Sequence, residues 1–120
     1  MEEASSAQMF CELHGEQLSA VTFVQNYLQL CFDGPCINVT NPLTVIASTS
    51  TVTSWKPGFR DALCAQIGKV VFSTIFEAGE ALVLRFTDNS VVSVSLRPND
   101  YTSAEAIYAY GFKHDGWLFA

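Results

Sequence analysis

The chain has 120 residues, of which 49% are hydrophobic and only 15% charged, and its formal net charge is −6. This length fits a single domain, 1–120, that buries a core without disulfides or structural metals. All basic residues follow residue 55 and do not cluster, which argues against nucleic acid as a partner. The acidic start and the short apolar runs predict no signal peptide and no membrane contact, so we expect a cytoplasmic protein with reduced cysteines.

Apolar spacing predicts a first helix over about residues 4–13. Residues 13–42 or so follow a strand pattern. In the motif Leu-x-Leu-x-Phe, which ends at Phe32, apolar residues occupy every second position, and a turn and a second alternating segment follow. With a preceding strand at about 16–24, this region predicts a three-stranded meander. We expect Phe32 to lie opposite Ile37 in its hairpin, since opposed residues share one face of the sheet.

The segment that follows the first meander has a different character. Residues 43–46 alternate and are expected to be extended, whereas the Ser- and Thr-rich residues 47–54 form either a loop or an edge strand. A second helix over about 57–66 is predicted to start at Pro57, since proline is favoured in the first turn of a helix.

The pattern of residues 13–42 recurs at about 66–98, from a Gly-x-x-Val start through Leu-x-Leu-x-Phe to a final proline. By the same argument, Phe86 should lie opposite Val92. A C-terminal hairpin over about 105–119 follows. These elements predict a mainly β, α+β fold, in which two tandem three-stranded meander repeats form a rolled sheet or open barrel with one or two short helices.

Three segments of the second half carry a resemblance: Ala65-Gln66-Ile67-Gly68-Lys69-Val70-Val71, Leu82-Val83-Leu84-Arg85-Phe86-Thr87-Asp88-Asn89 and Glu105-Ala106. Together they are similar to the pattern of a group of small bacterial domains of unknown function. The resemblance covers about half of the chain. It implies a β-rich fold and brings no known activity, and the chain departs from the pattern at Asn89-Ser90, where the pattern has glycine.

Cys11, His14, Cys31 and Cys36 are residue types that zinc accepts, and a helix packed on the first hairpin would give them a closed site. The spacing of Cys31 and Cys36 is loose for zinc, and the second hairpin shares the pattern without ligands. We therefore expect free thiols and no cofactor. The expected register places Cys31 and Cys36 diagonally, which also argues against a disulfide.

Aromatic side chains are the main candidates for a functional surface, because tyrosine and tryptophan with few charges are typical of interface centres. Tyr108, Tyr110 and Phe112 alternate and should share a face, for which core packing is the structural interpretation. The candidate interface residues are Phe112, Trp117 and Phe119. The candidate residues for a ligand pocket are Trp55, Tyr108 and Tyr110.

No motif of nucleophilic catalysis is present, and the histidines are His14 and His114, of which His114 precedes Asp115 in a predicted turn. We therefore expect a non-enzymatic protein-interaction module that forms a homodimer. Its acidic first half could also bind a basic protein, as an immunity-type inhibitor of a toxin or nuclease would. The alternative is a small-ligand-binding protein or enzyme with a pocket inside the rolled sheet.

Overall fold

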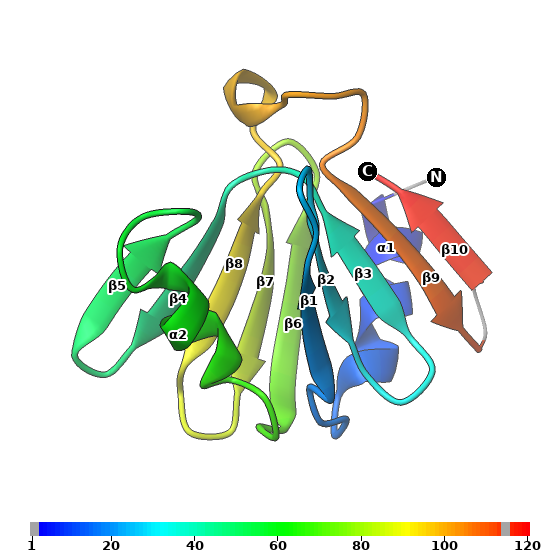
Figure 1. Cartoon of the computed structure of the whole chain (residues 1–120). Helices are drawn as coiled ribbons and strands as arrows, with labels where there is room; N and C mark the ends of the chain where they lie inside the picture. The colour runs from blue at the N-terminus through cyan, green and yellow to red at the C-terminus, as the bar shows by residue number, and fades with distance from the viewer. Residues whose placement is uncertain (1–2, 114–115) are drawn as a thin grey trace.

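The computed structural model describes residues 3–113 and 116–120. The protein is mainly β, with two antiparallel sheets (Figure 1). The first sheet consists, in spatial order, of β1 (Ala20–Phe23), β2 (Leu28–Cys31), β3 (Cys36–Val39), β9 (Ile107–Phe112) and β10 (Gly116–Phe119). The second sheet consists of β5 (Ser50–Thr53), β4 (Leu43–Ala47), β8 (Val91–Ser95), β7 (Ala81–Phe86) and β6 (Val71–Glu77).

Each sheet combines a three-stranded meander with a hairpin from elsewhere in the chain. The meander β1-β2-β3 is extended by β9-β10, and the meander β6-β7-β8 is extended by β4-β5. Read from β1, the first sheet has the order β1-β2-β3-β9-β10, and read from β6, the second has the order β6-β7-β8-β4-β5. Each strand of one sheet therefore has a counterpart at the same position in the other. We expected one rolled sheet or open barrel. The structure has two sheets that do not close, because the hairpin after each meander crosses to the other meander.

Side chains hold the chain where it crosses between the sheets. The Thr40 hydroxyl donates to the Glu105 carbonyl over 2.6 Å, and the Asn41 amide donates to the Ser95 carbonyl over 2.9 Å. At a second junction, the segments that lead into β1 and β6 pair through an isolated antiparallel bridge. Asn41 is buried, and the two bonds link the crossing between β3 and β4 to the segment before β9 and to the end of β8.

The hairpins inside the two meanders differ in register from the sequence-based prediction. In the first, Ile37 lies opposite Leu30 rather than Phe32. In the second, Val92 lies opposite Leu84, again two residues before the expected partner. A shift by two leaves every side chain on its face, so the hydrophobic pattern does not exclude it. The predicted faces are therefore correct and the predicted partners are wrong.

Both predicted helices are confirmed, and they fill the space between the sheets. Phe10 stacks on Phe76 of β6 at 5.6 Å between ring centroids and meets Phe112 of β9 edge-on at 5.7 Å. Phe59 lies edge-on to Phe23 of β1, and Figure 1 shows the two helices at opposite ends of the molecule. The helical elements are α1 (Glu3–Phe10), α2 (Phe59–Cys64) and the 3₁₀ turns Cys11–Leu13 and Pro98–Asp100.

Strand β9 changes face at Gly111. Tyr108 and Tyr110 point outward, but Phe112 is 4% exposed and packs in the core, not on the face that we predicted it to share with them. Gly111 has a φ of 81°, which interrupts the alternation, and a Cβ at this position would lie 2.4 Å from the Gly34 carbonyl oxygen. The turn between β2 and β3 thus approaches β9 at a point where only glycine fits.

Replacing Gly111 by alanine should destabilise the fold by about 2–4 kcal/mol, because it adds a left-handed alanine and a clash with backbone. Gly79→Ala is the matched control. Gly79 has a φ of 77° with nothing within 4 Å of an added Cβ, so there we expect the conformational cost of about 1 kcal/mol alone. Urea unfolding measures both variants, and equal losses would show that the approach of Gly34 does not constrain β9.

Candidate functional site

The outward side of the first sheet carries a continuous set of aromatic side chains. Tyr108 stacks on Phe119 at 4.4 Å and on Tyr110 at 4.9 Å between ring centroids, and Trp117 meets Phe119 edge-on at 5.4 Å. Trp117 and Phe119 are 60% and 50% exposed. Aromatic area that is held in fixed orientation and open to solvent is typical of a contact surface. We call this surface the aromatic face, and its strand residues are Ala20, Thr22, Gln29, Cys31, Cys36, Asn38, Tyr108, Tyr110, Trp117 and Phe119.

Strand alternation and register together produce the aromatic face. In β9 and β10, Ala109 and Leu118 are buried, so their neighbours along each strand point outward. The register places Asn38, Tyr108 and Phe119 in one row across three strands. Directly opposed side chains have Cβ atoms about 5 Å apart, which is close enough for rings to stack.

Amide and phenol groups form a hydrogen-bonded cluster on the same face. The Gln29 amide lies 3.0 Å from the Asn38 carbonyl oxygen and 3.2 Å from the Tyr110 phenol oxygen, and donates to both. Burial, followed by the neighbouring thiols of Cys36 and Cys31, raises the pKa of Tyr110, so its phenol stays neutral. Among the strand residues that make up this face, none is charged.

The zinc-type ligands considered in the sequence are not brought together. Cys31 and Cys36 lie directly opposite each other, not diagonally as predicted, and both are free and partly exposed. Cys11 is exposed near the end of α1, and His14 shares a hydrogen bond of 3.0 Å with the Thr74 hydroxyl of β6. Within residues 3–113 and 116–120, no three His, Cys, Asp or Glu side chains are placed to hold a metal ion. The predicted turn at His114 and Asp115 lies outside the described residues.

Trp55 belongs to a second aromatic cluster. Its ring lies edge-on to those of Phe23 and Phe59, and the Arg60 guanidinium is 5.6 Å from its centroid. Surface cavities of about 380 and 460 Å³ adjoin Trp55, and Arg60 lines both. Tyr108 borders another cavity, of about 210 Å³. Trp55 and Tyr108, which were predicted to border one pocket, therefore border different ones.

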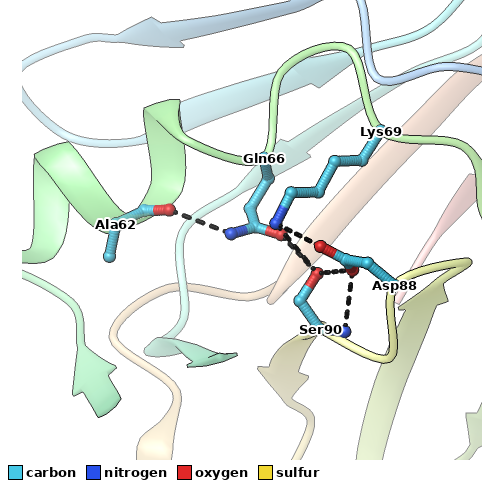
Figure 2. A network of polar contacts seen from close by, with 5 residues as sticks. All are labelled: Ala62, Gln66, Lys69, Asp88 and Ser90. Carbon is cyan, nitrogen blue, oxygen red and sulfur yellow. Dashed lines mark hydrogen bonds and ion pairs between the residues drawn. The ribbon is translucent and has the colours of Figure 1, made fainter. Parts of the chain in front are cut away.

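A third group of polar side chains lies beside the turn between β7 and β8 (Figure 2). Lys69 forms an ion pair of 2.7 Å with one carboxylate oxygen of Asp88, and the other oxygen accepts from the Ser90 amide over 2.9 Å. The Ser90 hydroxyl lies 2.8 Å from the Gln66 carbonyl oxygen, and the Gln66 amide donates to the Ala62 carbonyl in α2. These contacts tie the β7–β8 turn to α2 and to the start of β6.

This third group contains a serine and a lysine, but its geometry is structural rather than catalytic. Ser90 and Gln66 are buried, so their polar atoms do not face a substrate-sized opening. The Lys69 ammonium is held by Asp88, and a protonated lysine does not activate a nucleophile. Hydrogen bonds from Lys69 and then from Ser90 hold the pKa of Asp88 well below its usual range.

Asp88→Asn should lower the stability at pH 7 by less than about 1 kcal/mol, because solvent screens this half-exposed ion pair. The pKa of Asp88 is depressed in the folded state, so its contribution is present above the unfolded pKa of about 4 and is lost as the pH falls further. In urea unfolding, the difference between variant and wild type should shrink from about pH 5 to pH 2. Asp33→Asn, which removes one carboxylate from the β2–β3 turn, is the matched control for the loss of a negative charge. A difference for Asp88→Asn that persists at pH 2 would contradict the assignment.

Sequence reasoning identified the aromatic members of the face but missed its polar ones. Gln29 and Asn38 occupy ordinary outward positions of alternating strands, and nothing local distinguishes them from solvated residues. Their importance comes from the row that pairs Gln29 with Asn38 and Asn38 with Tyr108. A correct register and the knowledge that β9 pairs with β3 would have found them.

No protein-family model matches this chain, and neither the curated proteins nor the solved structures contain a match. The resemblance to small bacterial domains therefore stays a prediction. Of the helices that the structure describes, none is long and apolar enough to cross a bilayer.

Proposed function

We propose that the protein is a non-enzymatic interaction module that forms a homodimer through the aromatic face. The observation that supports this most is the stack of Tyr110, Tyr108 and Phe119 beside the exposed Trp117. These side chains stand on a set of strand residues without charge. Enrichment in tyrosine and tryptophan together with depletion of charge is typical of the centre of an interface.

The second sheet provides an internal comparison. At the corresponding positions of its strand order, it has Thr44 in place of Tyr108 and Thr53 in place of Phe119, and these residues are also directly paired. A sheet of the same order therefore folds with small hydroxyl side chains at these positions. Since folding does not require the aromatic rings, a contact outside the chain explains them better.

The lack of charged residues on the aromatic face favours a second copy of this chain as the occupant. Two chains of net charge −6 repel each other, and a face without charged strand residues lets them approach with the least repulsion. Four of the five strands have four residues and β9 has six. At about 4.8 Å between strands and about 3.3 Å per residue, the sheet projects about 24 by 15 Å, or about 360 Å². This area is below the 800 Å² or so per partner of a standard interface. We therefore expect a weak dimer, with a Kd between about 1 µM and 1 mM.

The other candidate functions use other parts of the molecule. A basic partner, such as the target of an immunity-type inhibitor, would bind acidic residues instead of the aromatic face, and its binding would weaken with salt. A ligand pocket inside the fold has less support, because buried side chains such as Leu30, Leu84 and Val92 occupy the space between the sheets. The cavities beside Trp55 are open at the surface.

The proposal includes an origin of the fold by duplication. Corresponding strand orders support a duplication of one unit, in which a helix precedes a meander and a hairpin follows it. The bridge between the segments that lead into β1 and β6 supports a description of the two sheets as halves of one rolled assembly. We include a bacterial, cytoplasmic setting in the proposal.

The double variant Tyr108→Thr/Phe119→Thr, which copies the second sheet, should raise the dimer Kd at least about tenfold, equivalent to about 1.4 kcal/mol. Sedimentation equilibrium measures the Kd, and circular dichroism checks that the variant is folded. Phe72→Thr is the matched control, because Phe72 is 63% exposed on β6 of the second sheet. A wild type that is monomeric up to about 1 mM, or an equal effect of Phe72→Thr, would contradict the proposal.

Salt separates self-association from binding of a basic partner. Raising the salt concentration from about 0.1 M to 1 M shortens the Debye length from about 10 Å to 3 Å, which screens the repulsion between two acidic chains. The wild-type dimer should therefore be unchanged or tighter at high salt, as measured by light scattering after size exclusion. Dissociation at high salt would show that ion pairs, rather than the aromatic face, hold the two copies together.

A further inference from the structure

Cys31 and Cys36 face each other across β2 and β3 on the outward side of the first sheet. They are register partners, and the Cys31 carbonyl accepts a hydrogen bond of 2.8 Å from the Ser19 amide, next to β1. The backbone polar groups of Cys31 therefore point away from β3. One residue further, the Phe32 amide donates to the Pro35 carbonyl. Cys31 and Cys36 thus form a non-hydrogen-bonded pair, which is the closer of the two kinds of antiparallel pair.

This geometry allows a direct bond between the two sulfur atoms. The Cα atoms of a non-hydrogen-bonded pair lie about 4.5 Å apart, inside the range of about 4.4–6.8 Å found for disulfides. A bond would therefore form without a large movement of either strand. Both residues are partly exposed, so a small reagent reaches them.

The two thiols are not equivalent. Burial, followed by a hydrogen bond to Cys36 and by the charge that Cys36 can carry, raises the pKa of Cys31 to about 12. Cys31 therefore keeps its proton at neutral pH. Since the thiolate is the reactive form of cysteine, this shift disfavours Cys31 as the first nucleophile.

The hairpin itself does not need cysteine at these positions. In the second sheet, the corresponding pair across β7 and β8 is Arg85 opposite Val91. Both hairpins connect neighbouring strands of a meander in antiparallel pairing. The paired thiols are therefore a feature of the first sheet alone, and folding of the meander does not account for them.

We propose that Cys31 and Cys36 form a dithiol site that is modified by low-molecular-weight disulfides. The Cys36 thiolate attacks one sulfur of the disulfide, which forms a mixed disulfide and releases one thiolate. Cys31 then loses its proton to solvent and attacks the Cys36 sulfur, which releases the second thiolate and closes the Cys31–Cys36 bond. The two cysteines are oxidised by two electrons and the small disulfide is reduced to two thiols. The chemistry of the site does not require the proposed homodimer. Because both cysteines belong to the aromatic face, the reagent reaches them in the monomer.

The test uses the full chain with Cys11→Ser and Cys64→Ser, which removes the other two cysteines, both exposed. Incubation with oxidised glutathione should lower the reactive thiols per chain from two to none, with a mass lower by two hydrogen atoms and no glutathione attached. Dithiothreitol should restore both thiols. Stable glutathione adducts, two unreacted thiols, or chains linked to one another by disulfides would each overturn the proposal.

Two further variants test the order of attack. With Cys31→Ser added, one glutathione should remain on Cys36, because no second thiol displaces it. With Cys36→Ser added, modification should be several-fold slower, because burial keeps Cys31 protonated. Equal rates in the two variants would overturn the assignment of Cys36 as the first nucleophile.

Discussion

The two-residue period of side chains along each strand is the constraint on which the rest of the structure depends. In both sheets it sends one set of residues into the space between the sheets, where Leu30, Ile37, Leu84 and Val92 are almost fully buried. Each such side chain contributes about 1.5–3 kcal/mol by burial. The alternate set points outward and takes no part in this packing. Outward positions are therefore free to differ between two sheets of the same strand order.

They do differ, and this difference is the basis of the functional account. One sheet has Tyr108 stacked on Phe119 where the other has Thr44 beside Thr53. The first sheet also has two opposed thiols where the second has an arginine and a valine. Because both sets sit on equivalent frameworks, the chemistry of the first sheet is not explained by folding. The proposed contact through the rings and the proposed exchange at the thiols would use neighbouring parts of one surface.

The sequence was sufficient for the features that depend on local pattern. Alternation gave the faces of β2, β3, β7 and β8 correctly, and helical spacing gave α1 and α2. Three features depend on more than local pattern. A register shift of two residues leaves every side chain on the same face of the sheet, as at Leu30 opposite Ile37. The hydrophobic pattern therefore does not distinguish the two registers. The crossing of β9 onto β3 depends on contacts between distant segments. Gly111 turns Phe112 inward through a positive φ that alternation does not encode.

Aromatic proton NMR spectra recorded during dilution from about 1 mM to 10 µM test the central claim most directly, since this range spans the expected Kd. The Trp117 and Tyr108 signals should shift together with dilution, following one dissociation curve, because both rings lie on the aromatic face. The Trp55 signals should stay constant, since Trp55 packs in a different cluster. Trp117 and Tyr108 signals that stay constant over the whole range, or a shift confined to Trp55, would contradict the account.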